Sequence, residues 1–409
     1  MRVLIVSQYF WPENFRINDL AREFQERGHA VMVLTGLPNY PSGRLFKGYG
    51  YRGPWKQSYE GVRVIRAPLI SRGGGGNLRL ALNYLSFAVM ASIIGLLRCR
   101  KAYDVIFVYE PSPITVAIPA IVLKWLSGAP LMLWVLDLWP ESVAAAGAVR
   151  SKALLWFIER LVRSIYRQCD HILVQSQAFR GHIERLGIVS SVIHYFPSWA
   201  ESLYTSMNGQ AALPENVRLP AGFRIMFAGN VGAAQDFETI IKAAEQLKRR
   251  SDIHWIVLGD GRKFAWVREE IRRRQLESQM HLLGRYPLEA MPAFFAHADV
   301  MLVTLRRDPI FALTIPGKVQ SYLACGRPVL AALDGEGARI IEAAGAGNTC
   351  PSGNPEALAA AVLELAEISK ETRERMGKQG ADYYHVHFDR KVLLDKLEGW
   401  MHDLVRTGC

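Results

Sequence analysis

The stretches that decide the fold are Phe227-Ala-Gly-Asn-Val-Gly-Ala-Ala-Gln235 and Ile315-Pro-Gly-Lys-Val-Gln-Ser-Tyr-Leu-Ala-Cys-Gly-Arg-Pro-Val329. In each, an apolar strand pattern runs into a turn of small residues, and a helix pattern follows. Such a turn directs backbone N–H groups and a helix N-terminus outward, which suits a phosphate. Two of these turns in one half of the chain predict a bound diphosphate, and we expect its carrier to be a nucleotide-sugar.

Outward from these stretches, apolar runs alternate with helix-period patterns along almost all of the 409 residues. This alternation is typical of parallel sheets in doubly wound α/β domains, whose ligands bind outside the carboxyl ends of the strands. We expect two Rossmann-like domains that face each other across a cleft. The strands are predicted at residues 3–7, 31–35, 62–67, 105–109, 131–135, 171–175, 191–195, 223–228, 253–258, 280–283, 300–303 and 329–332.

The domain organisation follows from the same pattern. Residues 1–197 are predicted to form an N-terminal domain, to which the family resemblance described below gives the acceptor, and residues 223–385 a C-terminal domain that binds the nucleotide-sugar. The weakly patterned stretch 198–222, with Pro214 and Pro220, is predicted to be a linker. Residues 386–409 follow the last expected strand, and we expect them to form a helix that returns to the N-terminal domain.

Composition narrows the choice of partners. The chain has 49 Lys+Arg against 38 Asp+Glu, a net charge of +11, but no motif of nucleic-acid binding, so we expect anionic substrates and a membrane surface rather than nucleic acid. Its 5 cysteines are far apart and form no Cys-x-x-Cys pair, which indicates a reducing compartment without disulfides. The absence of an Asp-x-Asp motif or of metal-ligand spacing predicts metal-independent chemistry and no cofactor besides the sugar donor.

Several motifs resemble known families. Gly229-Asn-Val-Gly-Ala-Ala-Gln235, Leu283-Gly-Arg-Tyr-Pro287 and Pro316-Gly-Lys-Val-Gln-Ser-Tyr-Leu-Ala-Cys-Gly-Arg-Pro328 look like the C-terminal half of family 4 glycosyltransferases. Gln8-Tyr-Phe-Trp-Pro-Glu-Asn-Phe-Arg-Ile-Asn-Asp-Leu20 and Leu136-Asp-Leu-Trp-Pro-Glu-Ser142 narrow the resemblance to the N-acetyl-L-fucosaminyl transferases of bacterial O-antigen and capsule assembly. The resemblance covers essentially the whole chain. It implies a GT-B fold, a UDP-sugar donor, a lipid-linked saccharide acceptor and transfer with retention of anomeric configuration.

The chain departs from the broad family pattern at three places. The usual pair of glutamates would fall at Leu313 and Ser321, and neither residue is acidic. Gln235 replaces a basic residue near the end of the Gly-Asn loop, and Leu136 replaces the histidine that often precedes Asp137. The family's usual contacts to the ribose and to the sugar hydroxyls therefore do not transfer directly, and we interpret the substitutions as a character of the fucosaminyl branch.

The donor-binding residues are predicted at strand ends and helix starts of the second domain: Gly229, Asn230, Gly232, Gln235, Arg285, Arg306, Pro316, Gly317, Gln320 and Ser321. Lys318, in the first turn of a helix, is predicted to act in catalysis by countering the charge of the departing phosphate. Only one of Arg306 and Arg307 is expected to point into the site. A tight βα turn, a solvated lysine and ordinary helix surface are the structural alternatives for these residues.

The first domain supplies two further catalytic candidates. Asp137 and Glu141 bracket Trp139-Pro140 beyond an apolar strand, where a carboxylate can hydrogen-bond donor hydroxyls or steer the acceptor; the alternative is a helix N-cap. Glu110 has a similar place after another strand, and Asn14 follows the first strand and should lie beside the site. If the leaving phosphate takes the acceptor's proton, no protein base is required.

Residues 80–97 form an uncharged run, close to the roughly 20 apolar residues of a spanning helix. Three interpretations stay open: a spanning helix, a buried or interdomain helix, and a helix that lies in the bilayer surface. The basic residues Arg72, Arg79, Arg98, Arg100 and Lys101 flank the run and suit anionic head groups. We expect a cytoplasmic protein peripherally associated with the inner leaflet of the cytoplasmic membrane, where it would meet a polyprenyl-diphosphate-linked acceptor.

Two other functions compete with glycosyl transfer. A nucleotide-sugar 2-epimerase of the same architecture needs acidic and histidine groups for elimination, and the central motifs have few. A non-catalytic, glycosyltransferase-like subunit that binds a partner or a lipid would explain why the glutamate pair is missing.

Overall fold

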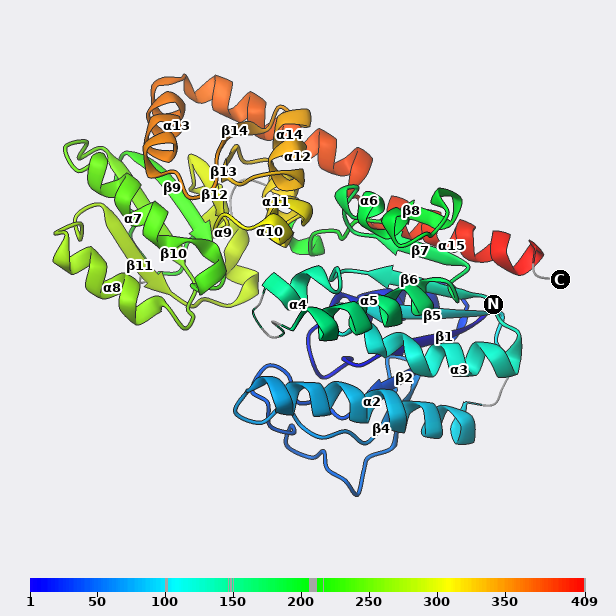
Figure 1. Cartoon of the computed structure of the whole chain (residues 1–409). Coiled ribbons are helices and arrows are strands. Elements are labelled where there is room, and N and C mark those ends of the chain that lie inside the picture. The colour runs from blue at the N-terminus through cyan, green and yellow to red at the C-terminus, as the bar shows by residue number, and fades with distance from the viewer. Residues whose placement is uncertain are drawn as a thin grey trace. The chain divides into compact units, whose positions relative to one another are not determined.

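The computed structural model describes residues 1–99, 102–145, 147, 149, 151–205, 212–215 and 217–407. The chain folds into two compact units, Met1–Phe196 with Leu394–Cys409 and Pro197–Leu393 (Figure 1). Each unit is built on its own largely parallel sheet, so the predicted α/β architecture is confirmed. The predicted strands are present in both units, because apolar runs of this length are buried on both faces of a parallel sheet.

The first unit has an 8-stranded sheet in the order β3-β4-β2-β1-β5-β6-β7-β8. Only β3 runs antiparallel to its neighbour β4. The order reverses between β1 and β5, and a crevice at the carboxyl ends of the strands is expected at such a switch point. The strands are β1 (Arg2–Ser7), β2 (Ala30–Gly36), β3 (Lys56–Tyr59), β4 (Val62–Ala67), β5 (Val105–Glu110), β6 (Leu131–Val135), β7 (His171–Val174) and β8 (Ile193–Tyr195); the helices are α1 (Arg16–Glu26), α2 (Asn77–Arg98), α3 (Ala117–Ser127), α4 (Glu141–Ala145), α5 (Lys152–Tyr166), α6 (Ala178–Arg185) and α15 (Arg390–Thr407).

The second unit has a 6-stranded parallel sheet in the order β11-β10-β9-β12-β13-β14. Its switch point lies between β9 and β12, which places the Gly229 loop at the carboxyl edge where ligands bind. The strands are β9 (Phe223–Ala228), β10 (Ile253–Leu258), β11 (Met280–Gly284), β12 (Val300–Thr304), β13 (Val329–Ala332) and β14 (Gly347–Cys350); the helices are α7 (Phe237–Gln246), α8 (Phe264–Arg273), α9 (Met291–Ala296), α10 (Pro309–Leu313), α11 (Gly317–Ala324), α12 (Glu336–Ala343), α13 (Pro355–Glu367) and α14 (Lys370–His387).

The stretch 198–222, predicted to be a linker, belongs to the second unit, which begins at Pro197. Within it Ser202–Tyr204 forms a 3-10 helix, and the Tyr204 ring stacks on Phe295 with centroids 5.4 Å apart. The first part of this stretch is therefore folded against its own unit. The sequence did not indicate this, because the segment has neither helix nor strand periodicity.

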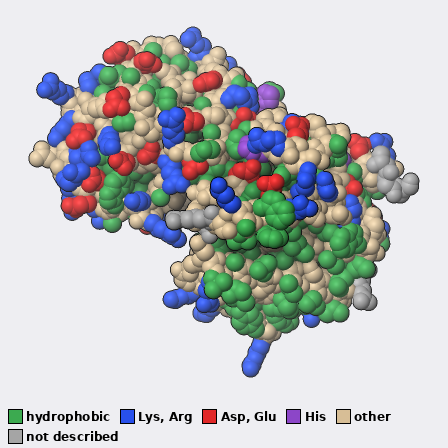
Figure 2. All heavy atoms as spheres, in the orientation of Figure 1, with side chains coloured by type: hydrophobic (Ala, Val, Ile, Leu, Met, Phe, Trp, Pro, Cys, Tyr) green, Lys and Arg blue, Asp and Glu red, His purple; other side chains and the backbone are tan. Residues whose placement is uncertain are grey.

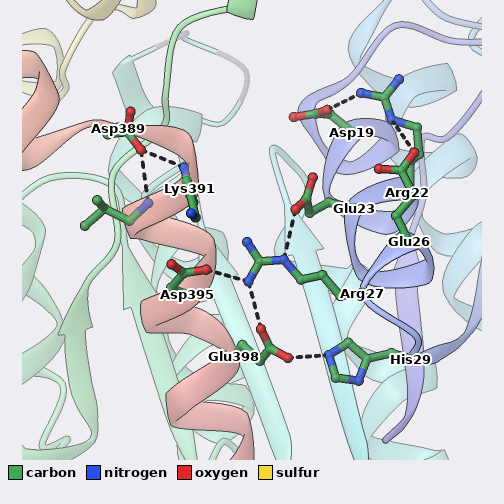
Figure 3. Close-up of polar contacts among 11 residues, drawn as sticks. Asp19, Arg22, Glu23, Glu26, Arg27, His29, Asp389, Lys391, Asp395 and Glu398 are labelled. Atoms are coloured by element: carbon green, nitrogen blue, oxygen red, sulfur yellow. Dashed lines mark hydrogen bonds and ion pairs between the residues drawn. The ribbon is translucent and has the colours of Figure 1, made fainter.

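The C-terminal part of α15 belongs to the first unit and is held there by charged groups (Figure 3). The Arg27 Nη1 atom lies 2.6 Å from an Asp395 carboxylate oxygen and 2.8 Å from one of Glu398. The other Glu398 oxygen lies 2.7 Å from Nε2 of His29, whose side chain is only 7% exposed. Glu398 thus joins α15 to two residues that follow α1.

We expect Glu398→Ala to lower the free energy of unfolding by about 1–3 kcal/mol, because it leaves the half-buried Arg27 and the buried His29 with fewer partners. Burial raises the pKa of Glu398, but hydrogen bonds from Arg27 and His29 outweigh it and hold that pKa below its usual value. The stabilisation is therefore present at neutral pH and is lost as the pH falls through the lowered pKa. Urea unfolding at several pH values measures this, with the exposed Glu26→Ala as the control; equal losses for the two variants would contradict it.

Helix α2 carries the uncharged run. Its inner side packs into the first unit through Phe87, Ala88 and Ala91, each at most 3% exposed. Of the described helices, it is the one long and apolar enough to cross a membrane by length and composition. Its outer side is exposed and apolar, at Leu78, Leu82, Leu85, Val89, Ile93 and Leu97.

Candidate functional site

The loop after β9 is a braced platform in the second unit. The N–H groups of Gly229 and Val231 donate to the carbonyls of Leu258 and Asp260, at 2.8 and 2.9 Å. The N–H of Gly232 donates to the side-chain oxygen of Gln235 at 3.2 Å. The turn was expected to direct backbone N–H groups outward, but those of Gly229, Val231 and Gly232 are already bonded to neighbouring chain.

Glycine is needed next to this loop for steric reasons. Gly259 has φ +130, and a Cβ there would come within 1.9 Å of the Gly229 carbonyl oxygen. Gly229 itself has φ +138, and a Cβ there would lie 2.6 Å from Cε of Lys318. The loop thus lets the lysine side chain lie directly on its backbone, with the exposed Asn230 beside it.

Lys318 is a desolvated cation. Its Nζ lies 4.7 Å from the centroid of the Phe227 ring. Burial alone lowers the pKa of Lys318 to about 8, and no carboxylate contributes to that shift. Lys318 is half-buried and pairs with no carboxylate of the described residues; a partly desolvated cation of this kind is unfavourable in the folded chain, and such groups gather at functional sites.

Lys318 lies in the first turn of α11, and no side chain caps the N-terminus of that helix. Tyr322 fixes the helix to the end of β9, because its hydroxyl bonds both the N–H of Ala228 at 3.1 Å and the carbonyl of Ala228 at 3.2 Å. Pro316 and Gly317 therefore begin a helix whose positive end lies beside the lysine. Together they make a place for an anion.

Several residues that were predicted to contact the sugar donor have other partners in the structure. Gln320 is 1% exposed, and its amide is oriented to donate to the carbonyls of Pro316 and Gly317. The Ser321 hydroxyl donates to the Gly317 carbonyl at 3.3 Å, inside its own helix. The Arg306 Nη2 atom lies 3.4 Å from a carboxylate oxygen of Asp308. The main-chain N–H of Arg306, just beyond β12, donates to the Ala234 carbonyl.

The remaining predicted residues of this unit are two exposed arginines and the loop residue Gln235. Arg285 and Arg307 are exposed side chains. Gln235 braces its own loop, because its side-chain oxygen accepts from Gly232 and lies 3.5 Å from the Asn230 amide nitrogen. The main-chain carbonyl of Gln235 in turn accepts a 2.5 Å hydrogen bond from Thr304. The sequence did not indicate which side chains of this loop bond within the loop itself.

At the carboxyl edge of the first unit, two carboxyl groups end neighbouring strands. Glu110 is fully buried, its Oε2 accepts from the Asp137 N–H at 3.4 Å, and its Oε1 has no partner among the described residues. Burial, and then the charge of Asp137, raise the pKa of Glu110 well above its usual value. Burial also raises the pKa of Asp137, whose Oδ2 accepts from Trp139 Nε1 at 3.0 Å.

Glu141 begins α4 and contacts His182 of α6 with 2.9 Å between Oε1 and Nδ1. Asp137 and Glu141 therefore have separate partners, although both were predicted to act on the sugar. Asn14 is exposed, whereas its neighbour Glu13 is buried and accepts 2.7 Å hydrogen bonds from the N–H groups of Asn39 and Tyr40. Burial raises the pKa of Glu13 to about 7.

Within the described part of the chain, no group of three or more His, Cys, Asp or Glu side chains is placed to hold a metal ion. The four described cysteines are free and buried: Cys99, Cys169, Cys325 and Cys350. The charged groups of the two units support electrostatic chemistry. A lysine and a helix N-terminus offer positive charge in one unit, and carboxyl groups with raised pKa values end strands in the other.

The two parallel-sheet units, each with polar groups at its carboxyl edge, define a two-domain α/β protein of the GT-B class. Residues 14–199 match the glycosyl transferase 4-like domain, and residues 222–367 match the glycosyl transferases group 1 domain. The chain belongs to the GT-B glycosyltransferases, as the sequence motifs indicated.

The chain is similar to named glycosyltransferases. It is 28% identical over 322 residues to the probable glycosyltransferase WbjE of Pseudomonas aeruginosa, which covers 76% of both chains. It is 24% identical over 351 residues to the putative colanic acid biosynthesis glycosyl transferase WcaI of Escherichia coli K12, covering 80% of this chain and 82% of that one. The structure of Anabaena HepE in complex with UDP superimposes with a TM-score of 0.69 at 15% identity, covering 98% of this chain and 100% of HepE, a likeness of fold.

Proposed function

We propose that this chain is a retaining glycosyltransferase that moves a sugar, with N-acetyl-L-fucosamine as the first candidate, from a UDP-sugar to a polyprenyl-diphosphate-linked saccharide in O-antigen or capsule assembly. The observation that carries the proposal is Lys318, a half-buried cation at an uncapped helix N-terminus that pairs with no carboxylate of the described residues. A diphosphate supplies the missing charge. HepE, which shares the fold, was solved with UDP, and WcaI bears the name of a polysaccharide pathway.

Lys318 and the first N–H groups of α11 stabilise negative charge as the UDP leaves, and preorganised charges of this kind are effective because they need no reorganisation. The leaving phosphate accepts the acceptor's proton, so transfer needs neither a protein base nor a metal. Asp137 orients hydroxyl groups of the reacting sugars. N-acetyl-L-fucosamine is chosen on the resemblance of the Trp-Pro-Glu motifs at both strand ends.

The proposal is tested with a panel of UDP-, GDP- and dTDP-sugars. For each compound, the melting temperature of the protein and product formation on a lipid-linked acceptor are measured. A UDP-sugar at a hundred times its dissociation constant should add about 2.7 kcal/mol to the free energy of unfolding. EDTA should leave transfer intact. Loss of transfer in EDTA that magnesium restores would reject metal independence, and UDP-sugar binding without transfer or hydrolysis would favour the non-catalytic subunit.

We further propose that the first unit binds the cytoplasmic face of the membrane. Figure 2 shows hydrophobic side chains gathered over the face of this unit that α2, α3 and α5 cover. The exposed residues there are Leu78, Leu82, Leu85, Val89, Ile93 and Leu97 of α2, Trp125 and Leu126 of α3, and Leu154, Trp156, Phe157 and Leu161 of α5. Aromatic and aliphatic side chains beside arginines are typical of a surface that enters the head-group region.

The double substitution Leu85→Asp and Val89→Asp should reduce binding to phosphatidylglycerol vesicles roughly a hundredfold, because two exposed apolar side chains no longer enter the bilayer. Co-sedimentation measures the effect, and added salt should weaken wild-type binding. Val189→Asp, at another exposed valine of the same unit, is the matched control. Equal binding of the double variant and the wild type would contradict the membrane surface.

A further inference from the structure

Arg72 lies among aromatic rings at the carboxyl edge of the first unit's sheet. Its guanidinium carbon is 5.8, 5.2 and 5.9 Å from the ring centroids of Tyr9, Tyr40 and Tyr84. Its Nη2 donates to the Tyr84 hydroxyl at 3.2 Å, and its main-chain N–H donates to the Asn39 side chain at 3.1 Å. The side chain is half-buried and held in place on several sides.

The Arg72 guanidinium has N–H donors that the contacts above do not use. A guanidinium carries five N–H donors, and no carboxylate of the described residues forms an ion pair with this one. The contrast is Arg66 of β4, a buried arginine whose nitrogens donate to the carbonyls of Gly36 and Trp11 and to the side chain of Gln57. The side-chain N–H groups of Arg66 are used in contacts within the unit, whereas some of those of Arg72 are available to bind an oxyanion.

An apolar hollow lies close by. It has a volume of about 520 Å³ and is bordered by Ile70, Leu78, Leu82 and the Gly75-Gly76 turn, with Arg79 at its edge. Residues 70–72 run from the hollow to the tyrosines around Arg72. The main chain of Ile70 is hydrogen-bonded to the side chains of Asn83 and Ser86 of α2, and Arg79 Nε donates to the Ser71 carbonyl at 3.1 Å. Three residues of chain span at most about 10 Å, so the hollow and the Arg72 fork are within reach of one amphiphile.

We infer that this site binds an isoprenoid diphosphate, with the diphosphate on Arg72 and Arg79 and the first isoprene units in the hollow. The inference rests on the proposed function, because it locates the acceptor's lipid carrier on the first unit. Charge and shape agree with this ligand: two cations without a carboxylate ion pair in the described structure lie beside apolar walls. The hollow opens beside the exposed stripe of α2, along which the rest of the chain would enter the bilayer.

Farnesyl diphosphate is the test ligand, since it is soluble and has both parts of the proposed ligand. Binding is measured by calorimetry on the whole chain with saturating UDP, so that a nucleotide site is filled. We expect Arg72→Gln to weaken binding at least tenfold, as the loss of a charge-assisted contact does. Arg98→Gln, at the other end of α2, should leave it unchanged, and Arg72→Lys should restore part of it.

Farnesol and inorganic pyrophosphate, each with half of the ligand, should bind at least about tenfold more weakly than farnesyl diphosphate. Equal affinity of Arg72→Gln and wild type would overturn the inference, as would equal affinity for pyrophosphate alone. Competition by phosphatidylglycerol vesicles equal to that of farnesyl diphosphate would overturn it in favour of ordinary head groups. UDP stabilisation of each variant reports correct folding. If UDP fails to bind while Arg72-dependent farnesyl diphosphate binding persists, the donor proposal fails and this inference stands.

Discussion

Lys318→Met is expected to lower kcat for transfer by about 10²–10³-fold, because it removes a preorganised positive charge where the leaving diphosphate develops its own. The methionine keeps the volume of the side chain, so the contacts with Gly229 and Phe227 remain filled. UDP affinity should fall as well, since the half-buried cation would lose its charge interaction with the diphosphate. Steady-state kinetics and calorimetry with UDP measure the two effects.

The pH dependence of kcat/KM provides a second measurement on the same residue. Burial lowers the pKa of Lys318 to about 8, so the free enzyme loses this cation, and with it kcat/KM, as the pH rises through 8. Lys318→Arg should keep part of the activity and lose that alkaline limb, because arginine stays protonated. Lys242→Met, at an exposed lysine of α7 paired with Glu238, is the matched control and should change neither property. A Lys318→Met variant with wild-type kcat would remove the main support for the donor site.

The sequence predicted the edge strands β8 and β11 but missed the other two edge strands, which lack an apolar run. β3 (Lys56–Tyr59) lies at a sheet edge and is composed of KQSY, and β14 (Gly347–Cys350) is composed of GNTC, so neither has an apolar run to detect. No strand was predicted between residues 35 and 62, although that stretch contains β3. Edge strands are half-solvated, and their pairing depends on neighbours that local pattern does not encode.

For the candidate site, the sequence located the turns but not the state of the side chains. Lys318 followed from Pro-Gly-Lys at a helix start, whereas its desolvation depends on Phe227 and Gly229, which are distant in sequence. Gln320 was predicted to contact the donor, with helix surface as the alternative, and is buried, because α11 turns that face toward its own N-terminal carbonyls. Arg72 was identified only as a basic residue near an apolar run, since its three tyrosines come from separate segments of chain.

Asp137→Asn is expected to lower kcat by about 100-fold, because the amide keeps an oxygen for Trp139 but loses the charge that orients sugar hydroxyls. Burial raises the pKa of Asp137, although the hydrogen bond from Trp139 opposes the shift. Wild-type activity should therefore fall on the acid side as this carboxylate becomes protonated, at a higher pH than an exposed aspartate would give. The variant should lack that acid limb.

The control for Asp137 is Asp104→Asn, which changes an aspartate that precedes β5 and pairs with Arg2 at 2.7 Å. It should leave kcat unchanged. Trp139→Phe separates orientation of substrate from support of the loop, because it removes the indole donor of Asp137 and leaves the carboxylate in place. If Asp137 only supports the loop, Trp139→Phe and Asp137→Asn will lose the same activity and both will keep the acid limb. UDP stabilisation, measured on each variant, should stay at the wild-type value because Lys318 belongs to the other unit.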